Sequence, residues 1–82
     1  MDATGLLARI VVEPGKMGGK PVIRGRRVTP SMVLAMLANR TSREDVLHAY
    51  PVLRAEDIDA CLLYAARLSE RSGADGLTVA AE

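Results

Sequence analysis

The sequence predicts a mainly α-helical domain with a short β-hairpin at its N-terminal end. Two runs rich in β-branched residues, 10–12 and 21–23, flank a stretch that contains glycine and proline, as the strands of a hairpin do. Three later segments combine apolar residues at helical spacing with helix start and stop signals. A chain of 82 residues makes one domain. We expect a flexible N-terminal arm, a single folded domain and a flexible C-terminal tail at residues 1–8, 9–71 and 72–82.

The predicted hairpin needs support from other parts of the molecule. Pro21 suits the start or the edge of a strand because it cannot donate a ladder hydrogen bond, and Gly25 ends the second strand. A hairpin with about three residues in each strand is not stable alone. It must therefore lean on the helices or pair with a second copy, and we expect Val22 and Ile23 to contact a second copy or another partner.

The first helix is predicted over residues 31–38. Thr29 can cap its N-terminus with a hydroxyl oxygen, and Pro30 suits the first helical position, where no N–H is required. Asn39 and Arg40 follow the last periodic residue, and asparagine tolerates the left-handed conformation that is common after a helix. Both ends of this helix are therefore marked in the sequence.

The second helix is predicted to end near residue 50, because Pro51 disfavours a helical conformation in the residue before it. Its start has two alternatives. Thr41 with Glu44 fits a capping box, and Ser42 with Asp45 fits the same pattern one residue later. The two patterns place the N-cap of this helix one residue apart, and the sequence does not decide between them.

The third helix, residues 55–71, has the clearest amphipathic pattern in the chain. Its acidic first turn suits the positive end of the helix dipole. Its apolar residues recur every three or four positions, at Ile58, Cys61, Leu62, Ala65 and Leu68. Three short helices with tight connections pack as a tri-helical bundle, and helix-turn-helix domains of the homeodomain-like or winged-helix-like kind are a common use of such a bundle.

Charge is unevenly distributed along a nearly neutral chain. Residues 1–30 carry six cations and two acids, a net +4, whereas residues 31–82 carry five cations and eight acids, a net −3. The basic half includes Arg24, Arg26 and Arg27 within four residues. Arginine binds phosphate groups and guanine edges well. The cluster has three interpretations: contact with nucleic acid, pairing with carboxylates of the protein, or plain solvation.

Strand alternation would divide these arginines between two faces. Arg24 and Arg26 would lie together, and Arg27 would lie opposite and pair with an acid of the third helix such as Asp57 or Asp59. The acidic start of that helix opposes simple docking into the major groove, because carboxylates repel phosphates. We therefore expect the basic hairpin to carry much of the affinity. The predicted DNA-binding residues are Lys20, Arg24, Arg26 and Arg43.

Several function classes have no support in the sequence. Cys61 is the only cysteine, which excludes a disulfide framework and suits a reducing cytoplasm. Cys61 and His48 lack a third group for catalysis or metal binding, and Pro21 follows Lys20 where a phosphate-binding loop needs Ser or Thr. No run approaches the roughly 18 apolar residues of a membrane span, and no signal peptide is evident. We expect a cytoplasmic protein that is not an enzyme and uses no cofactor or metal.

Apolar residues outside the main helical stripes suggest a dimer. The apolar content is high for a short chain, at 49%. Met32 lies off the stripe of the first helix and Leu63 off that of the third. A two-fold dimer would place two helix-turn-helix units on a palindromic site. The expected dimer or partner contacts are Val22, Ile23, Met32 and Leu63.

The segment Gly19-Lys20-Pro21-Val22-Ile23-Arg24-Gly25-Arg26-Arg27-Val28 resembles the signature Gly-Lys-Pro-x-Ile-x-Gly-Thr-Arg-Ile of a bacterial family catalogued as domain of unknown function 433. The later run Tyr50-Pro51-x-Leu53 also resembles that family, and the resemblance covers about residues 9–68. Arg26 departs from the family's usual Thr. Further departures are Asn39-Arg40 in place of Ala-Gly and Arg54 in place of a Thr or Ser cap.

The resemblance implies a helix-turn-helix fold and, in many members, an antitoxin that is the partner of a PIN-like toxin ribonuclease. We therefore expect a DNA-binding antitoxin that neutralises such a toxin and represses its own operon. The toxin contact is expected either in the tail after Ser72 or in the folded domain. The alternative is a protein-interaction module of the same fold that does not bind DNA.

Overall fold

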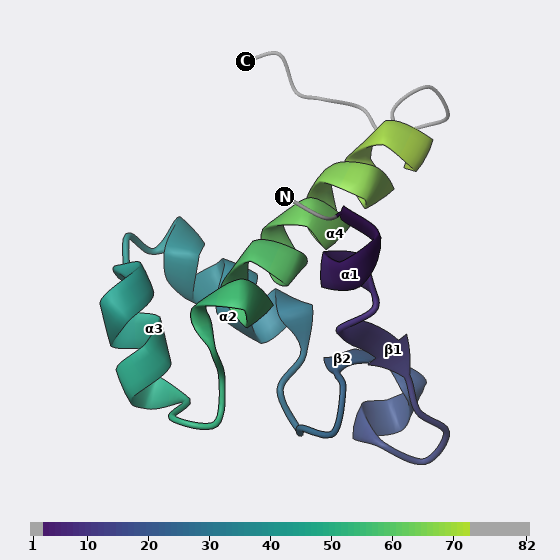
Figure 1. The fold of residues 1–82 in the computed structure, drawn as a ribbon, viewed down its shortest axis with the longest axis horizontal. Helices are drawn as coiled ribbons and strands as arrows, with labels where there is room; N and C mark the ends of the chain where they lie inside the picture. Colours follow the sequence, from purple (N-terminus) through teal and green to yellow (C-terminus); the bar gives the residue numbers. More distant parts are fainter. Residues whose placement is uncertain (1–2, 73–82) are drawn as a thin grey trace.

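The computed structural model describes residues 3–72, and its side chains are described from residue 5 to residue 71. The domain is mainly helical with an N-terminal two-stranded antiparallel hairpin, as predicted (Figure 1). The elements follow one another as α1 Ala3–Leu7, β1 Ile10–Val12, the 3-10 turn η1 Met17–Gly19, β2 Pro21–Ile23, α2 Pro30–Ala38, α3 Arg43–Ala49 and α4 Ala55–Ser72.

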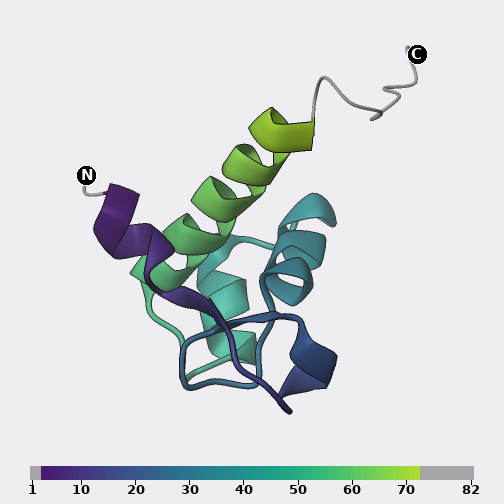
Figure 2. The same cartoon turned by 90° about the vertical axis from the view of Figure 1, so that its right-hand side faces the viewer.

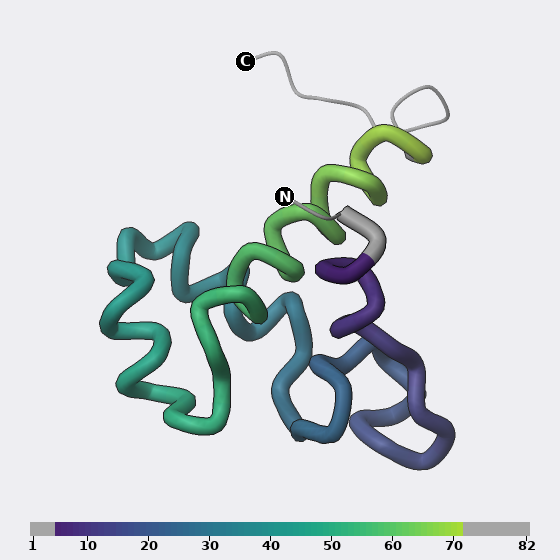
Figure 3. The backbone as a smooth tube through the Cα atoms, in the orientation of Figure 1, coloured from purple at the N-terminus to yellow at the C-terminus, as the bar shows by residue number. Residues whose placement is uncertain are grey.

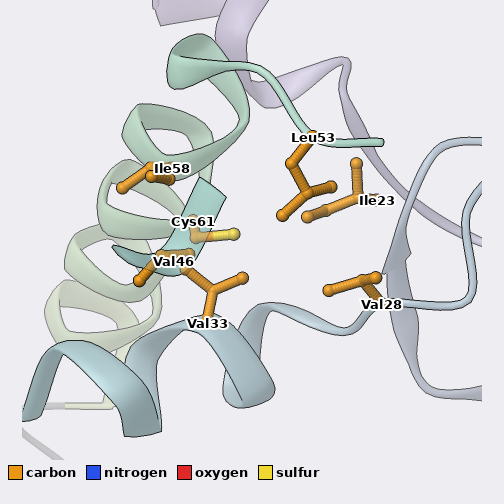
Figure 4. Packing of buried hydrophobic residues seen from close by; sticks show 7 residues of the cluster. All are labelled: Ile23, Val28, Val33, Val46, Leu53, Ile58 and Cys61. Carbon is orange, nitrogen blue, oxygen red and sulfur yellow. The ribbon is translucent and has the colours of Figure 1, made fainter. Parts of the chain in front are cut away.

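Helices α2, α3 and α4 enclose one hydrophobic core (Figure 4). Val33 of α2, Val46 of α3 and Ile58 of α4 are completely buried. Cys61, one turn further along α4, is buried with them. Removing such side chains from water is the main stabilising contribution in a domain of this size. The hairpin and the connecting loops close the core with Ile23, Val28 and Leu53.

The hairpin leans on this core. Its register pairs Val11 with Val22, and the glycine-containing connection between the strands includes η1. Val22 is 0% exposed and Ile23 is 2% exposed. The prediction that Val22 and Ile23 contact a partner is therefore wrong for their side chains, because both are already covered within the domain.

The starts of α2 and α3 confirm the capping signals. The Thr29 hydroxyl accepts a hydrogen bond from the Met32 N–H at 3.2 Å, and Pro30 is the first residue of α2. Ser42 rather than Thr41 caps α3, since its hydroxyl accepts from the Asp45 N–H at 3.0 Å. The later of the two alternatives is therefore the one that forms.

The end of α2 places a non-glycine residue in the left-handed region. The Thr41 N–H donates to the Met36 carbonyl at 2.9 Å and the Arg40 N–H donates to the Leu37 carbonyl at 3.0 Å, which is the hydrogen-bond pattern of a Schellman motif. Arg40 has φ +68°. Asn39, the residue expected to tolerate this conformation, instead has φ −88°.

Residues 3–7 differ from the flexible arm expected over residues 1–8. They form α1, which packs against α4 (Figure 2). Leu6 of α1 is only 9% exposed, and Arg9 forms an ion pair with Asp57 of α4. Burial of Leu6 and this charge contact favour a helix that five residues would not sustain alone. The tail expected from residue 72 lies outside the described residues beyond Ser72, which ends α4.

Candidate nucleic-acid interface

Residues 24–27, here called the basic loop, form a turn directly after β2. The Arg26 N–H donates to the Ile23 carbonyl at 2.8 Å, and the Ile23 N–H donates to the Val28 carbonyl at 2.9 Å. Gly25 has φ +75° in the third position of the turn, where a type II geometry requires a left-handed residue. The loop lies at the same end of the molecule as the hairpin connection, opposite the C-terminal half of α4 (Figures 2 and 3).

All three arginines of the basic loop are exposed to solvent. The alternation that was predicted to separate Arg27 from Arg24 and Arg26 is wrong, because the chain leaves the strand at Ile23 and turns. Lys20, directly before β2, is also exposed, and residues 20–27 are here called the hairpin arm. Among residues 5–71, no carboxylate lies within ion-pair distance of Lys20 or of the three loop arginines.

Glu13 holds the basic loop in place from the end of β1. Its Oε2 accepts a hydrogen bond from the Gly25 N–H at 3.2 Å, and its Oε1 lies 2.7 Å from the Lys16 ammonium. The hydrogen bond from Lys16, followed by that from the Gly25 N–H, lowers the pKa of the Glu13 carboxyl below its usual value. Glu13 therefore stays ionised near neutral pH and links the two arms of the hairpin.

Arg43, predicted as a DNA contact, instead joins α3 to α4. Its Nη2 lies 2.8 Å from the Asp59 carboxylate and also donates to the Ala55 carbonyl at 3.4 Å. The expectation that Arg27 pairs with Asp57 or Asp59 is wrong, since Arg9 and Arg43 take those positions. The four predicted DNA residues thus separate into an unpaired group on the hairpin arm and one paired arginine on α3.

Asp57 is the most constrained acid of α4. Its side chain is only 8% exposed, one oxygen lies 3.0 Å from Arg9 Nη1, and the other accepts from the Arg54 N–H at 2.8 Å. The second bond is one half of a capping box, in which the side chain at the third helical position accepts from the N–H of the N-cap residue; Arg54 has no hydroxyl or carboxylate to form the other half. Two of the three acids in this helix start are therefore neutralised within the domain, and Glu56 is exposed.

Two hollows flank the hairpin arm. One, of about 310 Å³, is lined by residues of α1, by Arg9, by Arg24 of the basic loop and by Asp57. The second, of about 220 Å³, lies between the start of α2 and the C-terminal half of α4. It is lined by Lys20, Pro21, Thr29, Pro30, Ser31, Tyr64 and Leu68.

The predicted dimer residues on the helices are only half-buried. Met32 packs against the core, and its sulfur accepts from the Thr29 N–H at 3.5 Å, so it belongs to the cap of α2. Leu63 is half-buried on α4. The large apolar side chains that are most exposed are others: Val12, Val52, Leu62 and Leu68. Leu62 and Leu68 belong to the apolar stripe predicted for the third helix, so that stripe is not buried along its whole length.

Cys61 and His48 are in different environments. Cys61 is within the core, where burial and then the nearby Asp57 carboxylate raise the pKa of its thiol to about 12. His48 is exposed on α3. Within the described part of the chain, no three His, Cys, Asp or Glu residues gather as metal ligands. No helix described by the structure is both long and apolar enough to cross a membrane.

Comparison with known proteins returns one match. No curated protein and no solved structure matches the chain. A family model described as "Protein of unknown function (DUF433)" matches residues 10–65, a span that includes the hairpin, the basic loop, α2, α3 and the first half of α4. This range agrees with the resemblance seen in the Gly19–Val28 segment. Since it covers more than half of the sequence, the chain belongs to the DUF433 family.

Proposed function

We propose that this protein is a DNA-binding antitoxin that contacts its operator through the basic loop. One observation supports the DNA contact above the others: Lys20, Arg24, Arg26 and Arg27 are all exposed on one hairpin arm, and none has a carboxylate partner among residues 5–71. Unpaired arginines are suited to phosphate, which their planar guanidinium groups bind in a bidentate manner.

The expected affinity is strongly dependent on salt. Each phosphate neutralised on duplex DNA contributes about −0.9 to the slope of log K against log salt concentration. Contacts from all four cations of the arm would therefore give a slope of roughly −3.6 for one protomer. The restrained turn favours such contacts, because the Glu13 hydrogen bond to Gly25 fixes the loop backbone before binding.

The acids at the start of α4 would repel DNA less than their number suggests. Asp57 and Asp59 already pair with Arg9 and Arg43, so their charges are largely balanced before any DNA approaches. Glu56 is the remaining acid of this helix start. The basic loop, rather than the start of α4, is accordingly the element proposed to carry the affinity.

The antitoxin role rests on the family resemblance and on the exposed apolar surface. Many members of the family look like partners of PIN-like toxin ribonucleases. In the proposed role, this protein would neutralise such a toxin and repress its own operon in the cytoplasm. Leu62 and Leu68 are 44% and 40% exposed on α4, the helix that contributes Ile58 and Cys61 to the core. Exposed apolar residues of this kind favour a protein partner, whether the toxin or a second copy.

The direct test measures binding to the native upstream region at two salt concentrations. The double variant Arg24→Ala/Arg26→Ala is expected to lose most of the affinity and to flatten the salt dependence. Arg67→Ala/Arg71→Ala is the matched control, because both residues are exposed on α4 and their loss changes the net charge equally. Equal binding by the two double variants would refute the proposed DNA contact.

A second function is favoured by the hollow between α2 and α4. This hollow is lined mainly by proline, tyrosine and leucine side chains, which suit a protein partner better than a phosphate. The alternative is therefore a protein-interaction module that does not bind DNA. Co-purification with the neighbouring toxin that persists in Arg24→Ala/Arg26→Ala, but is lost in Leu68→Glu, would favour this alternative, provided that the unsubstituted protein also fails to retain DNA.

A further inference from the structure

We infer that the hollow beside α1 receives one backbone phosphate of the DNA that the basic loop contacts. This hollow, here called the α1 hollow, has a volume of about 310 Å³ and is lined by Gly5, Ala8, Arg9, Ile23, Arg24 and Asp57. The inference rests on the proposed function, and it adds Arg9 and the α1 segment to the binding surface.

The α1 hollow is continuous with the basic loop. Arg24 belongs to both, since it is the first residue of the loop and also lines the hollow. The Arg24 N–H donates to the Arg9 carbonyl at 2.7 Å, so the backbones of the two arginines are directly joined. A duplex that lies on the basic loop therefore brings its backbone to the mouth of the hollow.

The charge of the hollow is positive despite Asp57. Both oxygens of Asp57 are already engaged, one by Arg9 and the other by the Arg54 N–H. Arg9 uses only Nη1 for this contact, and its side chain is 37% exposed. Its other guanidinium nitrogens remain available as donors, because arginine has five N–H groups in total. Together with Arg24, this leaves a formal charge of +1 among the lining residues.

The walls of the hollow leave room for a phosphate and its adjoining sugar. Gly5 has no side chain and Ala8 has a single methyl group, so the α1 side of the hollow is open. The volume lies at the lower end of the roughly 300–1,000 Å³ of small-ligand pockets. Bidentate binding of a phosphate by an arginine that a carboxylate already holds in place costs less conformational entropy than binding by a free side chain.

The decisive variant puts a negative charge at the wall of the hollow. Ala8 is exposed, so Ala8→Glu leaves the Arg9–Asp57 pair in place while it repels a phosphate. Ala49→Glu is the matched control, because Ala49 is exposed at the end of α3 and the change in net charge is equal. We expect Ala8→Glu to bind operator DNA roughly tenfold more weakly than Ala49→Glu at low salt, from repulsion at about 5 Å. The salt slope should also be lower in magnitude by about one.

The failures of the two proposals are distinguishable. Absence of operator binding by the unsubstituted protein would overturn the proposed function, and this inference with it. Operator binding that is equal in Ala8→Glu and Ala49→Glu would leave the basic loop as the DNA contact and overturn the α1 hollow alone. Thermal unfolding of both variants checks that neither difference arises from loss of the fold.

A nuclear magnetic resonance titration tests the source of the phosphate. The probe is the side-chain Nε–H signal of Arg9, followed first with operator duplex and then with inorganic phosphate at the same ionic strength. A shift with duplex at substoichiometric concentrations supports a nucleic-acid phosphate. A shift with inorganic phosphate but none with bound duplex would show a site for free anions and overturn the inference.

Discussion

Glycine at position 40 is expected to give a more stable domain than alanine at the same position. Arg40 lies two residues after α2 with φ +68°, and its N–H and that of Thr41 close the Schellman hydrogen bonds. A non-glycine residue in the left-handed region costs about 1–2 kcal/mol. Glycine avoids this cost but loses about 0.5–1 kcal/mol through the greater freedom of its unfolded chain. Through the backbone alone, the gain expected for glycine at position 40 over a residue with a Cβ atom is therefore about 0.5–1 kcal/mol in the free energy of unfolding.

The comparison that isolates the backbone is Arg40→Gly against Arg40→Ala. Both variants lose the positive charge, which is favourable near the negative end of the helix dipole, so that loss cancels between them. Only the alanine variant keeps a Cβ atom in the left-handed conformation. Thermal unfolding should place the midpoint of the glycine variant roughly 3–6 °C above that of the alanine variant, given the usual scaling for a domain of this size.

Equal midpoints for the two variants would refute this reasoning. Such a result would mean that the turn after α2 adjusts its backbone without cost when the side chain changes. A urea titration adds a check, because a strain effect shifts the midpoint while the dependence of the free energy on urea stays constant. A change in that dependence would point to the unfolded state instead.

Three further predictions concern the anchors of the fold. Leu6→Ala should lower the free energy of unfolding, measured by urea titration, by about 2 kcal/mol. Leu62→Ala, at an exposed site, should lower it far less. Equal losses in the two variants would contradict the docking of α1. The Cys61 thiol, with its pKa raised to about 12, should react with a thiol reagent at pH 8 only after denaturation; rapid labelling of the folded protein would contradict its burial. Because the pKa of Glu13 is lowered in the folded state from 4.5, its stabilisation is present above that pH and is lost on acidification. Glu13→Gln should therefore be less stable at pH 7, with a difference in melting temperature that shrinks below about pH 4.5; a constant difference would argue against the ionised contact.

Local signals in the sequence were sufficient for most of the fold. Thr29 and Pro30 mark the start of α2 as predicted, because capping depends on residues only three positions apart. The amphipathic pattern likewise located the long helix and its buried Cys61. The hairpin was predicted by its β-branched runs, although Val22 and Ile23 of its second strand are buried within the domain.

Contacts between distant residues account for what the sequence did not predict. Arg9 and Asp57 are separated by 48 positions, and Arg43 and Asp59 by 16, so no local pattern shows which arginine pairs with which acid. The helix α1 was missed for the same reason, since five residues carry no periodic signal and their structure depends on α4. The basic loop was misread because alternation applies only while a strand continues, and β2 ends at Ile23.

The ion pair between Arg9 and Asp57 also has a consequence for synthesis on the ribosome. The first elements of the chain have their packing partner in the last helix, so α1 cannot dock until α4 has emerged. At about 5–20 residues per second, the 48 positions between the two partners take roughly 2–10 s to translate. During that interval the apolar side chains of the hairpin are without their final cover.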